Sequence, residues 1–232
     1  GFNSNEVAGE CVADIIRAGI LPVAIEFMDR PCIRATEAFA KAGYPDCEAL
    51  LIIEVEGSEA EIAEQLARIR QIALAHDPVE FREAADEDQA RRIWLGRKSA
   101  FGAMGQINDY MCLDGTIPVS SLPFVLKRIG EMSREFGLDV GNVFHAGDGN
   151  MHPLILFNAN KPGDLERCEA FGAEILKLCV EVGGCLTGEH GVGIEKRDLM
   201  GVQFAPADME AQMRVKDVFD PKWLLNPAKV FP

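Results

Sequence analysis

NVFHAGDGNMHPLILF, residues 142–157, predicts two short strands joined by a tight turn. Residues 142–145 and 151–157 are rich in apolar, β-forming side chains. The Gly-Asp-Gly-Asn run between them consists of residues that favour turns. Such a turn can fold the chain back on itself, so that His145 and His152 converge.

Helices and strands alternate on both sides of this hairpin. Ser4 can cap a first helix, and Ser58 with Glu61 forms an S-x-x-E capping box for another. The predicted helices span 5–18, 36–42, 58–75, 87–103, 120–136 and 163–182, and the other predicted strands span 22–28, 49–56, 79–82 and 110–113. This order predicts one α+β domain, an antiparallel sheet with helices on one face.

Composition and charge restrict the possible partners. The net charge of −14 disfavours nucleic acid and anionic membranes, because an acidic surface repels both. No stretch approaches the ~20 apolar residues that a membrane span needs. The seven cysteines form no C-x-x-C pair and their number is odd, which favours reduced thiols in a cytoplasmic protein over a disulfide framework.

Three of the four histidines fall into two motifs that can bind a metal. His145 and His152 flank the predicted turn, and Glu189 lies in a Gly-Glu-His-Gly-Val-Gly segment at 188–193. Two imidazoles and a carboxylate are a common ligand set for a divalent metal with an open coordination position. The alternative is a histidine pair that only packs in the core or on the surface.

Two further side chains are candidates for catalysis. Histidine is suited to accept a proton from an alcohol near neutral pH, so His190 is a candidate base, unless it only packs or is itself the ligand in place of Glu189. Arg97 lies on the predicted helix 87–103, and a guanidinium binds a carboxylate with two hydrogen bonds. An arginine on a helix is otherwise usually a solvated surface residue.

Taken in order, these segments resemble the C-terminal domain of the FAD-linked oxidases of the vanillyl-alcohol oxidase type. The resemblance runs from PVAIEFMD at 22–29, through YMCLDGTIP at 110–118 and the two histidine motifs, to LNPAK at 225–229. It implies a ferredoxin-like α+β cap domain and a separate N-terminal domain, outside these 232 residues, that binds FAD.

The resemblance also implies residue roles. His145, His152 and Glu189 match ligands of a metal that is usually zinc, and His190 matches the base. Arg97 matches a residue that contacts the substrate carboxylate, and Asn226 matches a residue near the flavin. Glu189 and Gly191 match residues on the cofactor side of the site. Further partners would be an electron-accepting protein or a quinone, and a second copy in a homodimer.

Departures from the 2-hydroxyglutarate branch of the family narrow the substrate. Leu154, Phe101 and Cys112 stand where that branch has polar side chains. Without those polar side chains, a second carboxylate on the substrate would lack partners. We therefore expect a small D-2-hydroxy acid such as glycolate or D-lactate, oxidised to the 2-oxo acid. Two other functions stay open, a metal-dependent hydrolase with a His₂Glu site and a non-catalytic binding domain.

Overall fold

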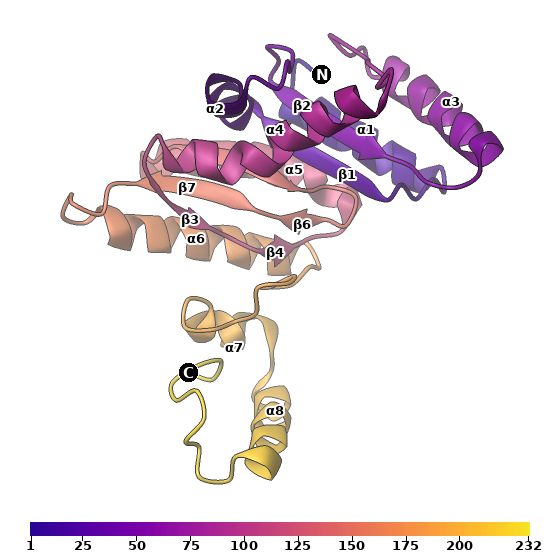
Figure 1. Cartoon of the computed structure of the whole chain (residues 1–232). Coiled ribbons are helices and arrows are strands. Elements are labelled where there is room, and N and C mark those ends of the chain that lie inside the picture. Colours follow the sequence, from indigo (N-terminus) through magenta and orange to yellow (C-terminus); the bar gives the residue numbers. More distant parts are fainter.

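An antiparallel sheet of seven strands forms the centre of the molecule (Figure 1). The structure is a computed structural model that describes all 232 residues. The strands are β1 (Ala24–Asp29), β2 (Ala49–Glu54), β3 (Asp109–Cys112), β4 (Gly115–Thr116), β5 (Val140–His145), β6 (Asn150–Met151) and β7 (Pro153–Phe157). The main order is β2-β1-β5-β6-β4, and β7 pairs with both β5 and β3. β5 is therefore central, because its first half pairs with β7 and its second half with β1.

Eight helices surround the sheet. They are α1 (Asn5–Arg17), α2 (Arg30–Ala40), α3 (Glu59–Ala75), α4 (Glu87–Gly105), α5 (Leu122–Phe136), α6 (Asp164–Glu181), α7 (Met200–Gln203) and α8 (Pro206–Phe219). Single 3₁₀ turns at Val119–Ser121 and Arg197–Leu199 precede α5 and α7. None of these helices combines the length with the apolar character that a membrane span requires.

Helices cover both faces of the sheet, not one face as the sequence predicts. Successive side chains of a strand point to opposite faces. On β5, Phe144 joins a cluster of 30 buried apolar residues that includes residues of α1, α5 and α6. Its neighbour Val143 joins a second cluster of 13 residues that includes residues of α2 and α4. The α+β class and the antiparallel sheet are confirmed, and the sheet is buried between two layers of helices (Figure 1).

Most predicted elements are confirmed, with two local exceptions. The capping box of Ser58 and Glu61 begins α3, and Ser4 caps α1. The helix predicted at 36–42 begins earlier, at Arg30, and ends at Ala40. The strand predicted at 79–82 is wrong, since those residues form no regular element.

The C-terminal part of the chain leaves the sheet. After α6 a loop passes the end of β4 and leads to α7 and α8, which extend away from the two helical layers (Figure 1). Several apolar side chains of this part are exposed, namely Val215, Val218, Phe219, Leu224 and Leu225. Buried apolar clusters therefore account for the sheet and its helices, but not for this extension.

Candidate metal and substrate site

The turn after β5 brings His145 and His152 together, as the sequence predicts. Their ring centroids lie 5.4 Å apart. Asp148 N–H donates to the carbonyl of His145 at 3.2 Å, and His145 pairs with Asn150 across the turn. Gly149 has φ +69°, and a Cβ on it would lie 2.1 Å from the carbonyl oxygen of Ile117. Glycine is required there both for the left-handed backbone and for the close approach.

Asp114 fixes the loop that carries Glu189 and His190. Its carboxylate is completely buried and accepts the backbone N–H of Glu189 at 3.0 Å and of His190 at 2.9 Å. The Lys196 ammonium and the Thr187 hydroxyl also donate to it, at 2.9 and 2.6 Å. Burial alone would raise the pKa of Asp114, but these donors hold the pKa below its ordinary value.

Asp114 is not among the site residues that the sequence predicts. The available signal was its position directly after the predicted strand 110–113 and before a glycine, where a polar side chain often leaves the sheet. Lys196 gave no local signal at all, because its partner is 82 positions away in the sequence.

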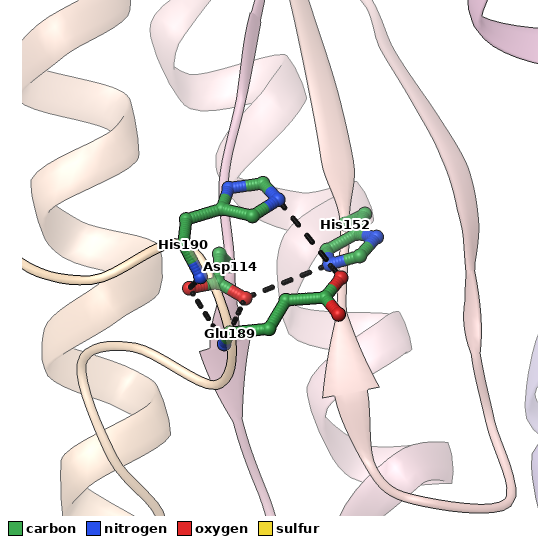
Figure 2. Close-up of side chains that lie close together, drawn as sticks. All are labelled: Asp114, His152, Glu189 and His190. Atoms are coloured by element: carbon green, nitrogen blue, oxygen red, sulfur yellow. Dashed lines mark hydrogen bonds and ion pairs between the residues drawn. The ribbon is translucent and has the colours of Figure 1, made fainter.

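Four donor side chains face one another at the centre of the site (Figure 2). Asp114, His152, Glu189 and His190 each offer a ligand atom within 4.8 Å of the others. Glu189 Oε1 lies 3.3 Å from Nε2 of His152 and 4.0 Å from Nε2 of both His145 and His190. His145, one of the predicted ligands, lies outside that group of four, and Asp114 takes its place there.

The nitrogen of His152 tests whether a metal fits. Its Nε2 is buried and has no hydrogen-bond partner, although it faces Glu189 Oε1 at 3.3 Å and Asp114 Oδ1 at 3.6 Å. A buried polar atom left without a partner is costly. Because imidazole nitrogens and carboxylate oxygens also have the chemistry that Zn²⁺ and similar ions select, the residues fit a divalent metal.

Protonation supports the same assignment. Burial, together with the nearby rings of His145 and His190, lowers the pKa of His152 and so favours its neutral form. A hydrogen bond to Glu26 raises the pKa of His145, although burial opposes this. The bond joins Nδ1 of His145 to Glu26 Oε1 at 2.8 Å and leaves Nε2 facing Glu189. A carboxylate behind a ligating histidine is the usual outer partner at metal sites.

Arg97 is buried beside this group and is not a solvated surface residue. Its Nε and Nη2 both contact Oε2 of Glu26 at 2.9 Å. The pKa of Glu26, which burial alone would raise, lies below its ordinary value because of its hydrogen bonds and charge contacts with His145 and Arg97. Glu26 therefore links Arg97 to His145, and no local pattern predicts this link, because Glu26 lies 71 and 119 positions from these partners.

The two remaining predicted residues, Gly191 and Asn226, lie outside the group of facing side chains. Gly191 is exposed, has φ +84°, and donates its N–H to Thr187 Oγ1 at 2.9 Å, so it belongs to the loop beside His190. Asn226 is exposed in the segment after α8, and that segment lies away from the sheet (Figure 1). The structure thus gathers His145, His152, Glu189, His190 and Arg97 around one site, but not Asn226.

An apolar wall borders the site next to His152. Phe101 presents its ring at 6.4 Å from that of His152, edge-on, and at 5.9 Å from the guanidinium carbon of Arg97. Cys112 and the fully buried Leu154 are direct neighbours across β3 and β7. The three residues that replace polar side chains of the 2-hydroxyglutarate branch therefore lie on adjoining elements, on the α4 face of the sheet.

Comparison with known proteins identifies relatives along the whole chain. The chain is 51% identical over 233 residues to glycolate oxidase subunit GlcD of Escherichia coli K12, covering 100% of the chain and 47% of the relative. It is 32% identical to GlcD of Bacillus subtilis, covering 99% of the chain and 49% of the relative. D-lactate dehydrogenase of Archaeoglobus fulgidus is 30% identical, with 99% and 50% covered. The chain thus spans about half the length of these relatives.

A solved structure and a family model agree with this placement. 4-Ethylphenol oxidase from Gulosibacter chungangensis, seen in an isoeugenol complex, superposes with a TM-score of 0.67 at 12% identity, over 99% of the chain and 52% of that structure. This likeness shows the fold alone. The family model described as FAD linked oxidases, C-terminal domain, matches residues 1–230. The chain therefore belongs to the C-terminal domain family of the FAD-linked oxidases.

Proposed function

We propose that the chain is the substrate- and metal-binding domain of a FAD-dependent dehydrogenase that oxidises a small D-2-hydroxy acid to the 2-oxo acid. The observation that carries the proposal is the unpartnered, buried Nε2 of His152 facing the Glu189 carboxylate, beside His145 and His190. Relatives named glycolate oxidase subunit and D-lactate dehydrogenase support the reaction class.

In this proposal His145, His152 and Glu189 hold the metal, which we take to be zinc. Asp114 is a weaker ligand candidate although its Oδ1 is close, because it already accepts hydrogen bonds from the Glu189 loop, Thr187 and Lys196. When bound, the ion supplies a Lewis acid that lowers the pKa of a hydroxyl group at the site. The protein's part is to hold the three ligands and to keep His145 oriented through Glu26.

His190 and Arg97 act on the substrate directly. His190 is exposed at the edge of the site, and its ring stacks on that of His152 with centroids 5.1 Å apart. We propose that His190 accepts the proton of the substrate 2-hydroxyl when the hydride leaves C2. FAD, when bound, would supply the acceptor for that hydride. Arg97 binds the substrate carboxylate through Nη1, since Nε and Nη2 are engaged by Glu26.

The size of the substrate follows from the wall next to His152. Phe101, Cys112 and Leu154 offer no charged group that could pair with a second carboxylate. Burying such a carboxylate without a partner is costly. Glycolate and D-lactate, each with one carboxylate, fit this wall better than a dicarboxylate.

The flavin and its domain belong to the remaining part of a longer protein. The relatives are about twice as long as the span that they share with the chain. Exposed apolar residues of α8 and the segment behind it, including Phe219 and Leu224, offer a surface for a second domain. Asn226 lies in that segment, so its proposed place near the flavin, like that of Gly191, depends on docking to the FAD-binding domain.

The unpaired cysteines support our proposal of a cytoplasmic location. An electron-accepting protein or a quinone would then reoxidise the flavin.

Metal content tests the ligands. We expect about one zinc per chain in the purified complete protein, measured by elemental mass spectrometry, and loss of most of it in His152→Ala. His76→Ala is the matched control, because His76 lies at the end of α3 and hydrogen-bonds Asp14. Equal metal in both variants would refute the ligand assignment.

Substrate oxidation tests the reaction. Glycolate or D-lactate should bleach the flavin absorbance of the complete protein, and D-2-hydroxyglutarate should do so poorly. His190→Gln should slow bleaching by roughly 10²–10⁴-fold, as loss of a general base does, while retaining the metal. Hydrolysis without flavin reduction would instead favour the metal-dependent hydrolase. A protein that neither binds metal nor bleaches would favour the binding domain.

A further inference from the structure

The outer edge of β2 borders a large apolar groove. The groove has a volume of about 1100 Å³, and 18 of the 28 residues that line it are hydrophobic. β2 forms its floor, since residues 50–54 line the groove. This strand is the last of the main sheet order, with β1 along one edge and only Phe2 bridged to the other. An apolar stripe of α3 forms one wall, and α4 contributes the other. The stripe consists of Ile62, Leu66, Ile69 and Ala73, and Trp94 lies on the α4 side.

The first two residues of the chain already occupy one end of this groove. Phe2 pairs antiparallel with Ala49, donating its N–H to the Ala49 carbonyl at 2.7 Å and accepting the Ala49 N–H at 3.1 Å. On the opposite side, Gly1 donates to the Glu80 carbonyl at 2.8 Å and accepts the Val79 N–H at 2.9 Å. The two residues thus pair as a short strand would, between β2 and the segment at 79–80.

The direction and register of this short strand are fixed by its hydrogen bonds. In an antiparallel ladder the backbone groups of alternate residues point to the same side. Since Ala49 bonds outward to Phe2, Leu51 and Ile53 also direct their N–H and C=O groups outward. Continuing the pairing backward places the residue immediately before Gly1 opposite Leu51, and the third residue before Gly1 opposite Ile53.

We propose that this groove holds the residues that immediately precede Gly1 in the complete protein, as a further strand antiparallel to β2. The relatives support the existence of such residues, since the chain covers 47% of the Escherichia coli glycolate oxidase subunit and matches a family described as a C-terminal domain. The proposal does not depend on the metal site or on the reaction.

The chemistry of the groove specifies the occupant. Leu50 and Ile52 belong to the core on the α2 and α4 face, whereas Leu51 and Ile53 pack against the core on the other face. A strand added to β2 would therefore be covered on both faces. Strands buried on both faces are near-continuous apolar runs, so we expect apolar side chains at about five consecutive positions before Gly1.

The buried amino group of Gly1 supports the same continuation. Burial lowers the pKa of this terminal ammonium, because a charge is poorly accommodated there. An amide N–H in its place could make the same hydrogen bond to Glu80 without a charge. The site is thus suited to a peptide bond. An uncovered apolar edge strand is also a site of unwanted pairing, which natural proteins usually cover.

Hydrogen exchange of the complete protein tests the proposal. Leu50 and Ile52 bond to β1 and serve as internal controls for Leu51 and Ile53. We expect all four amides to be protected on the order of 100-fold or more, as for a strand inside a sheet. Fast exchange at Leu51 and Ile53, beside slow exchange at Leu50 and Ile52, would overturn the proposal. Protection that appears only as protein concentration rises, together with a dimer in light scattering, would mean that a second copy occupies the groove.

A disulfide tests the register independently. Ile53→Cys combined with a cysteine at the third residue before Gly1 should form an intrachain disulfide, because paired residues of antiparallel strands lie within disulfide range. Moving the second cysteine to the fourth residue before Gly1 is the control, since its side chain then points to the other face. Mass spectrometry of peptides separates this bridge from pairs with native cysteines. Absence of the bridge, or an equal yield in the control, would contradict the register.

Discussion

Glu26 and Arg97 form an ion pair inside the protein, with 2.9 Å between Oε2 and Nη2 and side-chain exposures of 6% and 8%. The other oxygen of Glu26 forms a hydrogen bond with Nδ1 of His145 at 2.8 Å. One buried carboxylate therefore connects the middle of α4 to the end of β5. Through this contact the packing of a helix on the sheet determines the orientation of a candidate metal ligand.

Breaking this pair should destabilise the fold. Arg97→Met removes the guanidinium and leaves the buried Glu26 carboxylate with only its hydrogen bond to His145. We expect a loss of about 3–5 kcal/mol in the free energy of unfolding, measured by urea denaturation. Arg91→Met is the control, because Arg91 pairs with Glu87 and Asp88 at the surface and should cost ~1 kcal/mol or less. Similar losses in the two variants would contradict the importance of burial.

Stability should fall with rising pH because of Asp29. Burial raises the pKa of Asp29 to about 6 from an ordinary value of 3.8, although hydrogen bonds from Asn142 and Cys32 oppose the shift. The folded state therefore keeps a proton that the unfolded state releases. The stabilisation is complete below about pH 4 and is lost as pH rises through about 6, with a size on the order of 3 kcal/mol.

Asp29→Asn isolates this contribution. Urea denaturation between pH 4 and 7 should show a shallower fall of the unfolding free energy in the variant, because the ionisable group is gone. Asp46→Asn, at an exposed carboxylate, should keep the slope of the unchanged protein. The slope is the decisive quantity, since a changed helix cap at Asp29 alters stability equally at every pH. Parallel curves for all three proteins would show that Asp29 does not titrate in this range.

Asp114 should control the order of the loop that carries Glu189. Asp114→Asn removes the charge that the N–H groups of Glu189 and His190, and the ammonium of Lys196, contact. We expect faster hydrogen exchange at Glu189 and His190, weaker metal retention, and a stability loss of roughly 3 kcal/mol. Asp109→Asn is the control, because Asp109 accepts one N–H, from Ala159, at the surface. Unchanged exchange in Asp114→Asn would show that the loop is ordered by other contacts.

The backbone at Gly184 lies so close to β4 that no side chain should fit at this position. A Cβ there would lie 1.8 Å from the carbonyl oxygen of Thr116. Gly184→Ala should therefore cost about 3 kcal/mol or more, since the backbone would have to move. Gly102→Ala is the matched control, because no atom lies within 4 Å of its Cβ position on α4 and alanine favours a helix by about 1 kcal/mol. In thermal unfolding, the midpoint temperature should fall for Gly184→Ala and rise for Gly102→Ala.

Local patterns in the sequence predicted most single elements, and tertiary contacts explain the exceptions. The sequence predicts helix α2 only from residue 36, but this helix begins at Arg30, because proline is tolerated in a first turn and the side chain of Asp29 caps the helix. The strand predicted at 79–82 lacks a paired strand, because only Gly1 lies beside Val79 and Glu80. The second helical layer was missed because a strand buried on both faces has no alternating polar pattern.

The sequence alone determined the hairpin at 142–157, the α+β class, and the convergence of His145 and His152, because turn residues and apolar periodicity act over a few neighbouring positions. Only the tertiary structure decided that Asp114 anchors the Glu189 loop and that Glu26 joins Arg97 to His145. These partners lie 75, 71 and 119 positions apart in the chain. Their contacts depend on which elements become neighbours in the sheet, and no local preference of the chain encodes that arrangement.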